Sequence, residues 1–186
     1  MKDRRLERNH HLAFGQNTDL ILSLAAVIYL TFHPIMAWVS PNPADSWLQR
    51  LSVSGPMLLI AWRSRHPGLV SRHLNFFQTA SLTWLSLHYY YLTWASGFEN
   101  SWFLGVFVTM ASVAACMLTV GSLRFYSAVS LLSALAFTFF GIKTESQMVA
   151  FPSIATVIIA CYIGFISKLE LLEELARSSR SFENLF

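Results

Sequence analysis

Long apolar runs separated by short polar segments set the organisation of this chain. A helix needs about 20 mostly apolar residues to cross a bilayer. Runs that meet or approach this length cover residues 18–40, 47–62, 74–95, 102–120, 123–141 and 148–167. Because the connections between them are short, consecutive helices must run antiparallel. The pattern therefore predicts an all-α, polytopic membrane protein built as a bundle of six transmembrane helices.

The second apolar run is the weakest of the six predictions. It is short, it carries Arg50 near its start, and it contains the sequence Ser54-Gly55-Pro56. A proline inside a helix removes one backbone hydrogen bond and usually kinks the helix. We therefore expect a broken or tilted second helix.

Composition supports the membrane assignment. Hydrophobic residues make up 54% of the chain and charged residues only 12%, a balance that soluble domains rarely reach. Cys116 and Cys161 both fall inside apolar runs, so no disulfide framework is indicated. The polar segment 1–17 precedes an apolar run too long for a cleaved signal peptide. We expect a cytoplasmic segment 1–17, a membrane domain 18–167 and a cytoplasmic coupling helix 168–186.

The distribution of basic residues predicts the orientation. Of the 13 Lys and Arg residues, all except Arg50 and Lys143 fall on one side of the predicted spans. Basic loops stay in the cytoplasm, so both termini are expected there, with the protein in the inner (plasma) membrane. The basic loop around Arg63 to His73 is expected to contact anionic lipid headgroups and needs no nucleic-acid partner.

The tail from residue 168 carries a second pattern. Leu171, Leu175, Ser178, Phe182 and Leu185 alternate at spacings of four and three, as in a coiled-coil seam. Two heptads are too short to dimerise alone, so we expect a homodimer formed by the membrane bundle and this stalk together. The alternative is an amphipathic helix lying on the headgroups. The residues predicted to couple the membrane domain to its output are Lys168, Leu171, Leu175, Phe182 and Leu185.

Two resemblances to known families suggest functions for this tail and for the bundle. The end of the tail, RSSRSFENLF, resembles the segment that precedes the catalytic domain in bacterial class III adenylate cyclases. The region from Trp47 to about Val120 resembles the six-helix receptor domain of Vibrio-type quorum-sensing histidine kinases, which detect hydrophobic hydroxyketones. Its matching elements are the Arg50-Leu51 pair, the basic loop, FFQTASL at 76–82 and NSWFLGVF at 100–107. In that family an aromatic at the position of Trp102 lies in the ligand pocket, and a small hydroxyl residue stands where this chain has Gly105.

Both resemblances imply a membrane sensor or anchor that regulates a dimeric cytoplasmic output domain following residue 186. The tail favours a cyclase, and therefore cAMP synthesis, over a kinase. A small six-helix transporter is the alternative from another class. The spans carry no nucleophile motif, no P-loop and no paired acidic metal ligands, so no catalytic residue or cofactor is expected within this chain.

Polar residues inside the spans are candidates for a functional site. His33 and His88 are expected at the same level in the outer half of the membrane, on polar stripes that face the bundle interior. Three interpretations remain open: a hydrogen bond from each imidazole to a backbone carbonyl that Pro34 or a neighbouring hydroxyl leaves free, a ligand pocket, or haem or metal coordination by the two histidines. The predicted ligand pocket comprises His33, Trp84, His88, Tyr89 and Trp102. No HxxxH or CxxC spacing supports metal binding.

Tryptophans near the predicted span ends indicate interfacial belts. These residues are Trp38, Trp47, Trp62, Trp94 and Trp102. Only Trp84 is expected well inside a span.

Overall fold

The computed structural model describes residues 17–139 and 145–183, and in α8 the side chains of residues 148–171, 174 and 175. The described part is helical. Its helices are α2 (Thr18–Val39), α3 (Trp47–Ser64), α4 (Leu69–Arg72), α5 (Leu74–Ala95), α6 (Asn100–Ala115), α7 (Val120–Phe139) and α8 (Glu145–Glu183).

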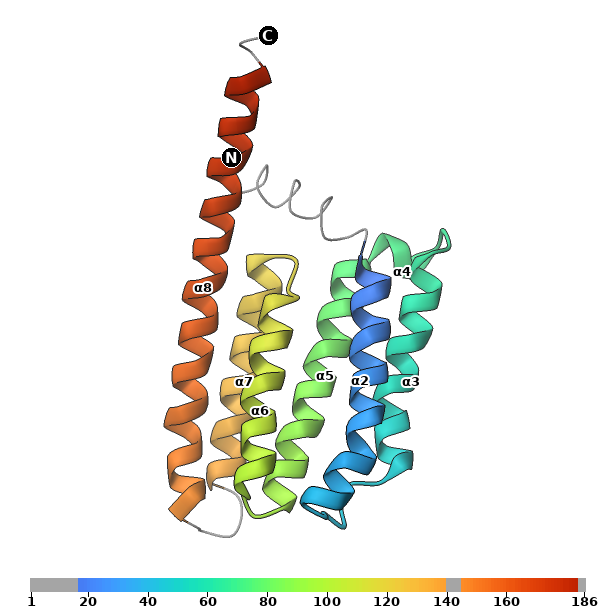
Figure 1. Ribbon diagram of the computed structural model, residues 1–186, viewed down its shortest axis with the longest axis vertical. Helices are drawn as coiled ribbons and strands as arrows, with labels where there is room; N and C mark the ends of the chain where they lie inside the picture. Colours follow the sequence, from blue (N-terminus) through green and yellow to red (C-terminus); the bar gives the residue numbers. More distant parts are fainter. Residues whose placement is uncertain (1–16, 140–144, 184–186) are drawn as a thin grey trace.

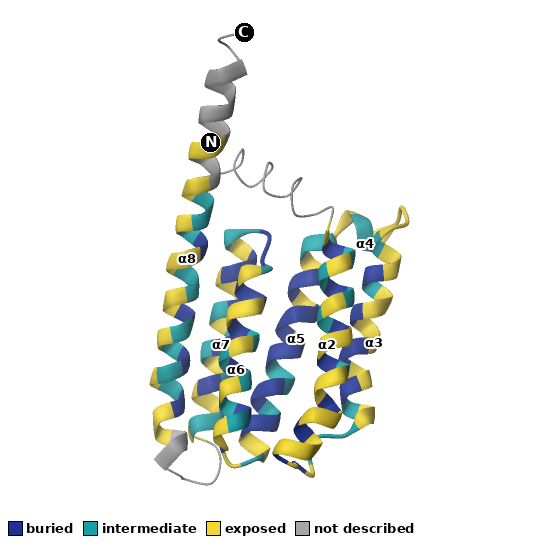
Figure 2. Ribbon diagram, viewed as in Figure 1, coloured by how far each residue is buried: buried dark blue, intermediate teal, exposed yellow. Residues whose placement is uncertain are grey.

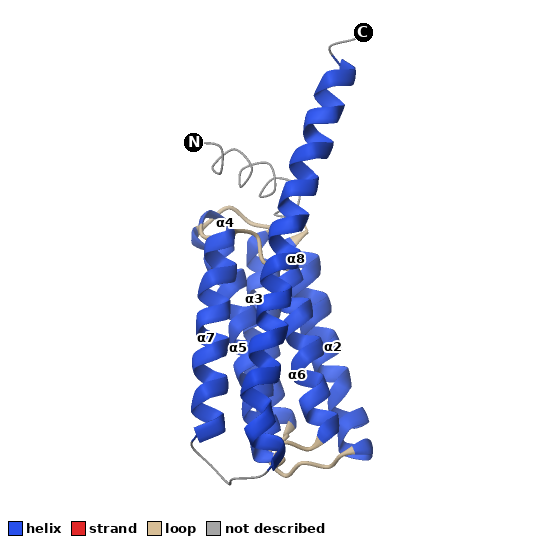
Figure 3. Ribbon diagram, turned by 90° about the vertical axis from the view of Figure 1, so that its left-hand side faces the viewer, coloured by secondary structure: helices blue, strands red, loops and turns tan. Residues whose placement is uncertain are grey.

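The six long helices stand side by side and alternate in direction (Figures 1 and 3). Packing runs from α2 to α3, from α3 to α5, and from α5 to both α6 and α7, while α8 covers α6 and α7. The start of α2, the short α4 and the far end of α8 share one end of the bundle. The antiparallel arrangement expected from the short connections is therefore present.

Three helices are long and apolar enough to cross a membrane: α2, α7 and the part of α8 from Met148 to Leu171. Helix α6 is apolar but shorter. Large hydrophobic side chains such as Leu24, Phe125 and Ile159 are exposed on the outside of these helices, which suits contact with lipid. Membrane association follows from these surfaces.

The outer helices bury a narrow stripe, which α2 illustrates (Figure 2). On α2 the buried side chains are Thr18, Leu22, Ala26, Tyr29, His33 and Met36, spaced by three and four residues as a single packed face requires. His33 thus faces inward as expected, but the buried face that carries it is mainly apolar.

Helix α5 lies at the centre and buries polar residues on several sides. Gln78 is almost fully buried; its amide oxygen accepts a hydrogen bond from the Thr18 hydroxyl at 2.8 Å, and its amide nitrogen donates to the Cys116 carbonyl at 2.8 Å. One side chain therefore ties α5 to the start of α2 and the end of α6. Satisfying both ends of the amide makes its burial tolerable.

Helix boundaries agree with the predicted spans except around residue 120. The fourth helix ends at Ala115, and α7 already begins at Val120. The Thr119 hydroxyl accepts a hydrogen bond from the Ser122 amide at 3.1 Å, which is an N-cap. The connection between the fourth and fifth helices therefore lies a few residues earlier than the sequence predicts. The second helix, α3, continues through Pro56 as one element. The break that was one of the two expectations for this helix is therefore absent.

Helix α8 is 39 residues long and extends beyond the other helices (Figure 1). Leu171 and Leu175 are more than half exposed, so one chain leaves this part of the predicted seam uncovered. The side chain of Phe182, and Leu185 as a whole, lie outside the described residues. The coiled-coil stalk stays a prediction.

Candidate functional site

A fully buried arginine occupies the start of α3. The Arg50 Nε donates to Asp45 Oδ1 at 2.7 Å and its Nη2 donates to Oδ2 at 2.8 Å, a two-pronged ion pair. Its Nη1 donates to the Tyr29 carbonyl of α2 at 2.5 Å, and the guanidinium lies 4.8 Å from the centre of the Tyr29 ring. Charges this deeply buried are tolerated only with such complete pairing.

Both histidines singled out from the sequence join this network. His33 Nδ1 lies 3.1 Å from Asp45 Oδ2; because a carboxylate only accepts, this nitrogen carries the proton. The Trp47 ring packs edge-on against His33 with 4.4 Å between ring centres. His88 Nδ1 hydrogen-bonds the Tyr29 hydroxyl. The network thus joins α2, the loop before α3, α3 itself and α5.

The loop between α2 and α3 is fastened to the neighbouring helices. Asn42 donates to the Leu92 carbonyl at 2.9 Å, and the Ser40 hydroxyl donates to the Glu99 carboxylate at 2.5 Å. The Trp102 ring nitrogen donates to the Ser40 carbonyl at 3.2 Å. Trp102 is fully buried, so its ring packs against protein. These bonds fix the position of Asp45.

Beside the network, an apolar groove of about 490 Å³ runs between α2 and α6 with α5 as its floor. Tyr29 and Tyr89 form part of its wall, so the network and the groove share Tyr29. Helix α2 contributes Leu24, Ile28 and Phe32 among others, and α6 contributes Leu104, Val108 and Thr109. The volume and the apolar lining suit a small hydrophobic molecule.

A glycine shapes this groove. A Cβ at Gly105 would lie 3.0 Å from Cε1 of Tyr89, closer than carbon atoms normally approach. The absence of a side chain therefore lets α6 approach the Tyr89 ring. The small hydroxyl residue that the resembled receptor family has here would crowd the ring.

The five predicted ligand residues do not line one pocket. His33 and His88 belong to the ionic network, Tyr89 lines the α2/α6 groove, and Trp102 holds the loop. Trp84 is half exposed and lines a different groove, between α5 and α7.

The haem or metal interpretation gains no support from this arrangement. The Nδ1 atoms of His33 and His88 have different partners, Asp45 and Tyr29. Within the described ranges no group of three or more His, Cys, Asp and Glu residues is placed to hold a metal ion. The expected backbone carbonyl partners are not the ones found at these Nδ1 atoms, because the partner of His88 is the Tyr29 hydroxyl and the partner of His33 is the Asp45 carboxylate.

Sequence reasoning missed Asp45 and the role of Arg50. Asp45 stands in a polar loop, where a solvated carboxylate is the ordinary expectation. Arg50 was considered only as a charge that weakens the prediction of the second transmembrane helix. The sequence does contain a relevant pattern, which is a carboxylate five residues before an arginine that lies at the start of an apolar helix. A charged arginine in a membrane is unstable without a close partner of opposite charge.

No family model matches the chain, and neither the curated proteins nor the solved structures contain a match to it. The fold and its buried network define a helical, membrane-associated protein, and its function must be inferred from its own geometry.

Proposed function

We propose that this chain is the membrane domain of a signalling protein, which senses a hydrophobic ligand or the state of the membrane and regulates a dimeric cytoplasmic output domain. The observation that carries the proposal is α8. It runs as one helix from Glu145, alongside α6 and α7, and on past the bundle to Glu183. A rigid helix that leaves a bundle without a break transmits rotation or translation along its axis.

The α2/α6 groove is connected to α8 through a single helix, α6. Leu104 and Val108 line the groove on α6, and α6 also packs against α8. An occupant that shifts α6 relative to α2 therefore changes the packing against α8. The ionic network beside the groove holds α2, α3 and the intervening loop as one rigid unit. A shift of α6 is therefore a movement relative to this unit.

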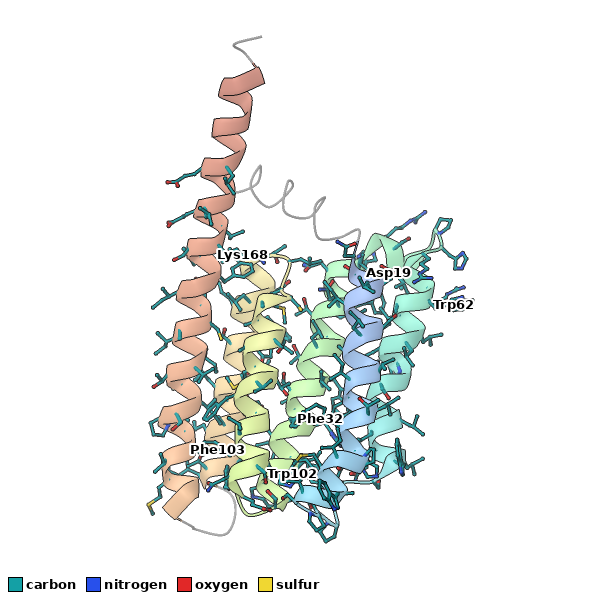
Figure 4. All side chains as sticks on the ribbon, viewed as in Figure 1. Asp19, Phe32, Trp62, Trp102, Phe103 and Lys168 are labelled. Carbon is teal, nitrogen blue, oxygen red and sulfur yellow. The ribbon has the colours of Figure 1, made fainter. Side chains whose placement is uncertain are left out.

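We further propose that α3, α5 and α6 cross the membrane together with the three long apolar helices, giving six spans. Asp19, Trp62 and Lys168 lie at one end of the bundle, and Trp102 and Phe103 at the other (Figure 4). The basic residues gather at the first end, so this end is cytoplasmic by the positive-inside rule.

An adenylate cyclase is the output domain we favour. Its support is the resemblance of residues 177–186 to the segment before class III catalytic domains, which act as dimers. The exposed Leu171 and Leu175 belong to the seam that would pair two copies of α8. The resemblance to histidine kinase receptors implies the same architecture with a different output.

The test grafts residues 1–186 onto a class III cyclase catalytic domain in a bacterium that lacks its own cyclase, and measures cAMP. Inserting one, two or three residues after Lys168 rotates the following helix by about 100° per residue. We expect cAMP output to change several-fold and to follow this rotation.

A seven-residue insertion is the matched control. It adds about two full turns, so the seam returns to its original direction and output should recover. If all four insertions give the same cAMP level, α8 is only a tether and the proposed rigid transmission is wrong.

A further inference from the structure

The outward face of α8 carries small residues where other helices of the bundle carry large ones. The bundle side of α8 is bulky and buried, with Ile154, Ile158 and Phe165 in the core. Along the outside runs a line of exposed small or hydroxyl-bearing residues, spaced by three or four positions: Thr156, Ala160, Gly164 and Ser167. Exposed residues of α2 and α7, such as Leu24 and Leu132, are large. Small residues on a membrane helix are typical of a surface where another helix packs.

Gly164 has no packing role within its own chain. A Cβ added there would meet nothing within 4 Å, whereas the glycine of α6, Gly105, lies against the Tyr89 ring. Glycine in the middle of a helix destabilises the helix relative to alanine, and no contact inside the bundle requires this one. A second helix whose backbone approaches α8 closely would require it. Ile159 and Ile163, which are exposed beside the line, would form the rim of such a contact.

The same line continues past the end of the bundle. Leu171 follows Ser167 by four residues, and Leu175 follows Leu171 by four, so both leucines lie on this face of α8. Each is more than half exposed. Lys168 lies where the other helices end (Figure 4), so the leucines are on the part of α8 that projects into the water phase. Exposed leucines on one face of a projecting helix indicate a partner that covers them.

The length of the line restricts what can cover it. From Thr156 to Leu175 it runs roughly 28 Å along the helix axis, from the membrane into the water phase. Lipid acyl chains do not reach the projecting leucines. A partner that covers the whole line must itself be a helix that leaves the membrane, with a surface that permits close approach first and an apolar surface after it. The α8 helix of a second copy has this surface.

Membrane topology and charge also favour a second copy. All copies share one orientation in the membrane, so two α8 helices meet in parallel, and a two-fold axis along the membrane normal brings identical faces together. No position on the line between Thr156 and Leu175 carries a charge. Identical faces can therefore meet without repulsion between like charges.

We propose that the outward face of α8 is the contact surface for a second copy of this chain, with the two helices parallel and their backbones closest at Gly164. The contact continues the leucine seam of the stalk into the membrane. This pairing rests on the proposed function in one respect, that two copies associate through α8, and it adds the place in the membrane where they meet.

The experiment measures association of the full chain in lipid vesicles by energy transfer between donor-labelled and acceptor-labelled copies, over a series of protein-to-lipid ratios. Gly164→Leu places a large side chain at the closest point of the contact. We expect this change to raise the dissociation constant at least about tenfold, because overpacking a close contact is destabilising.

Gly55→Leu is the matched control. Gly55 is exposed on α3, and a Cβ there also meets nothing within 4 Å, so the same substitution should leave the dissociation constant unchanged. Neither glycine packs within one chain, so both leucine variants should unfold in detergent as the unmodified chain does. Equal dissociation constants for both variants and the unmodified chain would overturn the proposal.

Cysteine cross-linking in native membranes locates the contact without disturbing it by a large side chain. With Cys116 and Cys161 changed to alanine, Ala160→Cys and Leu171→Cys should form disulfide-linked dimers on mild oxidation, because a disulfide requires close Cα atoms. Leu132→Cys, exposed on α7, is the control for random collision. Cross-linking that is no stronger at Ala160→Cys than at Leu132→Cys would also reject the interface.

These measurements are separable from the cAMP experiment. Dimers that cross-link at Ala160→Cys while cAMP output ignores the insertions after Lys168 would keep the α8 interface and reject rigid transmission. Output that follows the insertions in a chain that does not associate through α8 would do the reverse.

Discussion

Arg50 enters the bundle with its guanidinium held by Asp45 and by the carbonyl of Tyr29. The charge has no access to water, so its stability depends on these partners and on the Tyr29 ring beside the guanidinium. The Asp45 carboxylate depends equally on Arg50, because the only other group that hydrogen-bonds it among the described residues is His33. Each member of the pair therefore makes the other tolerable.

Replacing Arg50 by leucine should destabilise the protein by about 3–5 kcal/mol, because Asp45 is left buried without its main partner. The measurement is thermal or denaturant unfolding in detergent. The control is the double variant Asp45→Asn with Arg50→Leu, in which no charge is stranded. We expect it to be more stable than Arg50→Leu alone; a double variant that loses the sum of both single effects would show that the pair is not energetically coupled.

At the scale of helices, contacts between α5 and α6 depend on small residues and shared hydrogen bonds. Gly105 lies against the Tyr89 ring, and the single proton of the Thr93 hydroxyl is shared between the Tyr89 carbonyl of its own helix at 2.9 Å and the Trp102 carbonyl of α6 at 3.2 Å. Close approach of this kind is how helices associate in a bilayer, where burial of apolar surface gives no advantage over lipid.

Adding one methyl group at Gly105 tests this contact. Gly105→Ala places a Cβ 3.0 Å from the Tyr89 ring, and we expect about 1–2 kcal/mol of destabilisation from overpacking, together with a narrower α2/α6 groove. Unfolding in detergent measures the first effect.

The matched control is Gly164→Ala on α8, where a Cβ would meet nothing within 4 Å. Alanine there should be neutral, or stabilising by up to about 1 kcal/mol through helix propensity. If both alanine variants are equally stable, the Tyr89 ring moves freely and Gly105 does not set the groove.

On the scale of the whole molecule, the basic side chains of the described residues, apart from Arg50, collect at the end that holds α4 and the far part of α8. Arg50, one of the two exceptions in the sequence, is neutralised inside the bundle by Asp45, so it does not count as a loop charge. Lys143 lies outside the described residues. The buried ion pair thus removes one of the two residues that opposed the proposed orientation.

Single cysteines test that orientation. With Cys116 and Cys161 changed to alanine, we place one cysteine at the exposed Asn100 or at the exposed His66. A membrane-impermeant maleimide should label Asn100→Cys in intact cells and His66→Cys only in inverted vesicles. Labelling of His66→Cys in intact cells would reverse the proposed topology.

The sequence alone predicted the helical class, most helix boundaries and the inward stripe of α2, because these depend on local periodicity and on the length of apolar runs. It also indicated that His33 and His88 face the interior. The length of the apolar runs placed the break after residue 120, whereas the N-cap bond at Thr119 starts α7 at Val120.

Only the tertiary structure decided which polar groups meet. Asp45 reaches Arg50 and His33 because hydrogen bonds from Asn42 and Trp102 hold the loop against two other helices. The two grooves likewise arise from the spacing between helices that are distant in sequence. Such pairings depend on how three or more elements pack at once, which the residues within one element do not specify.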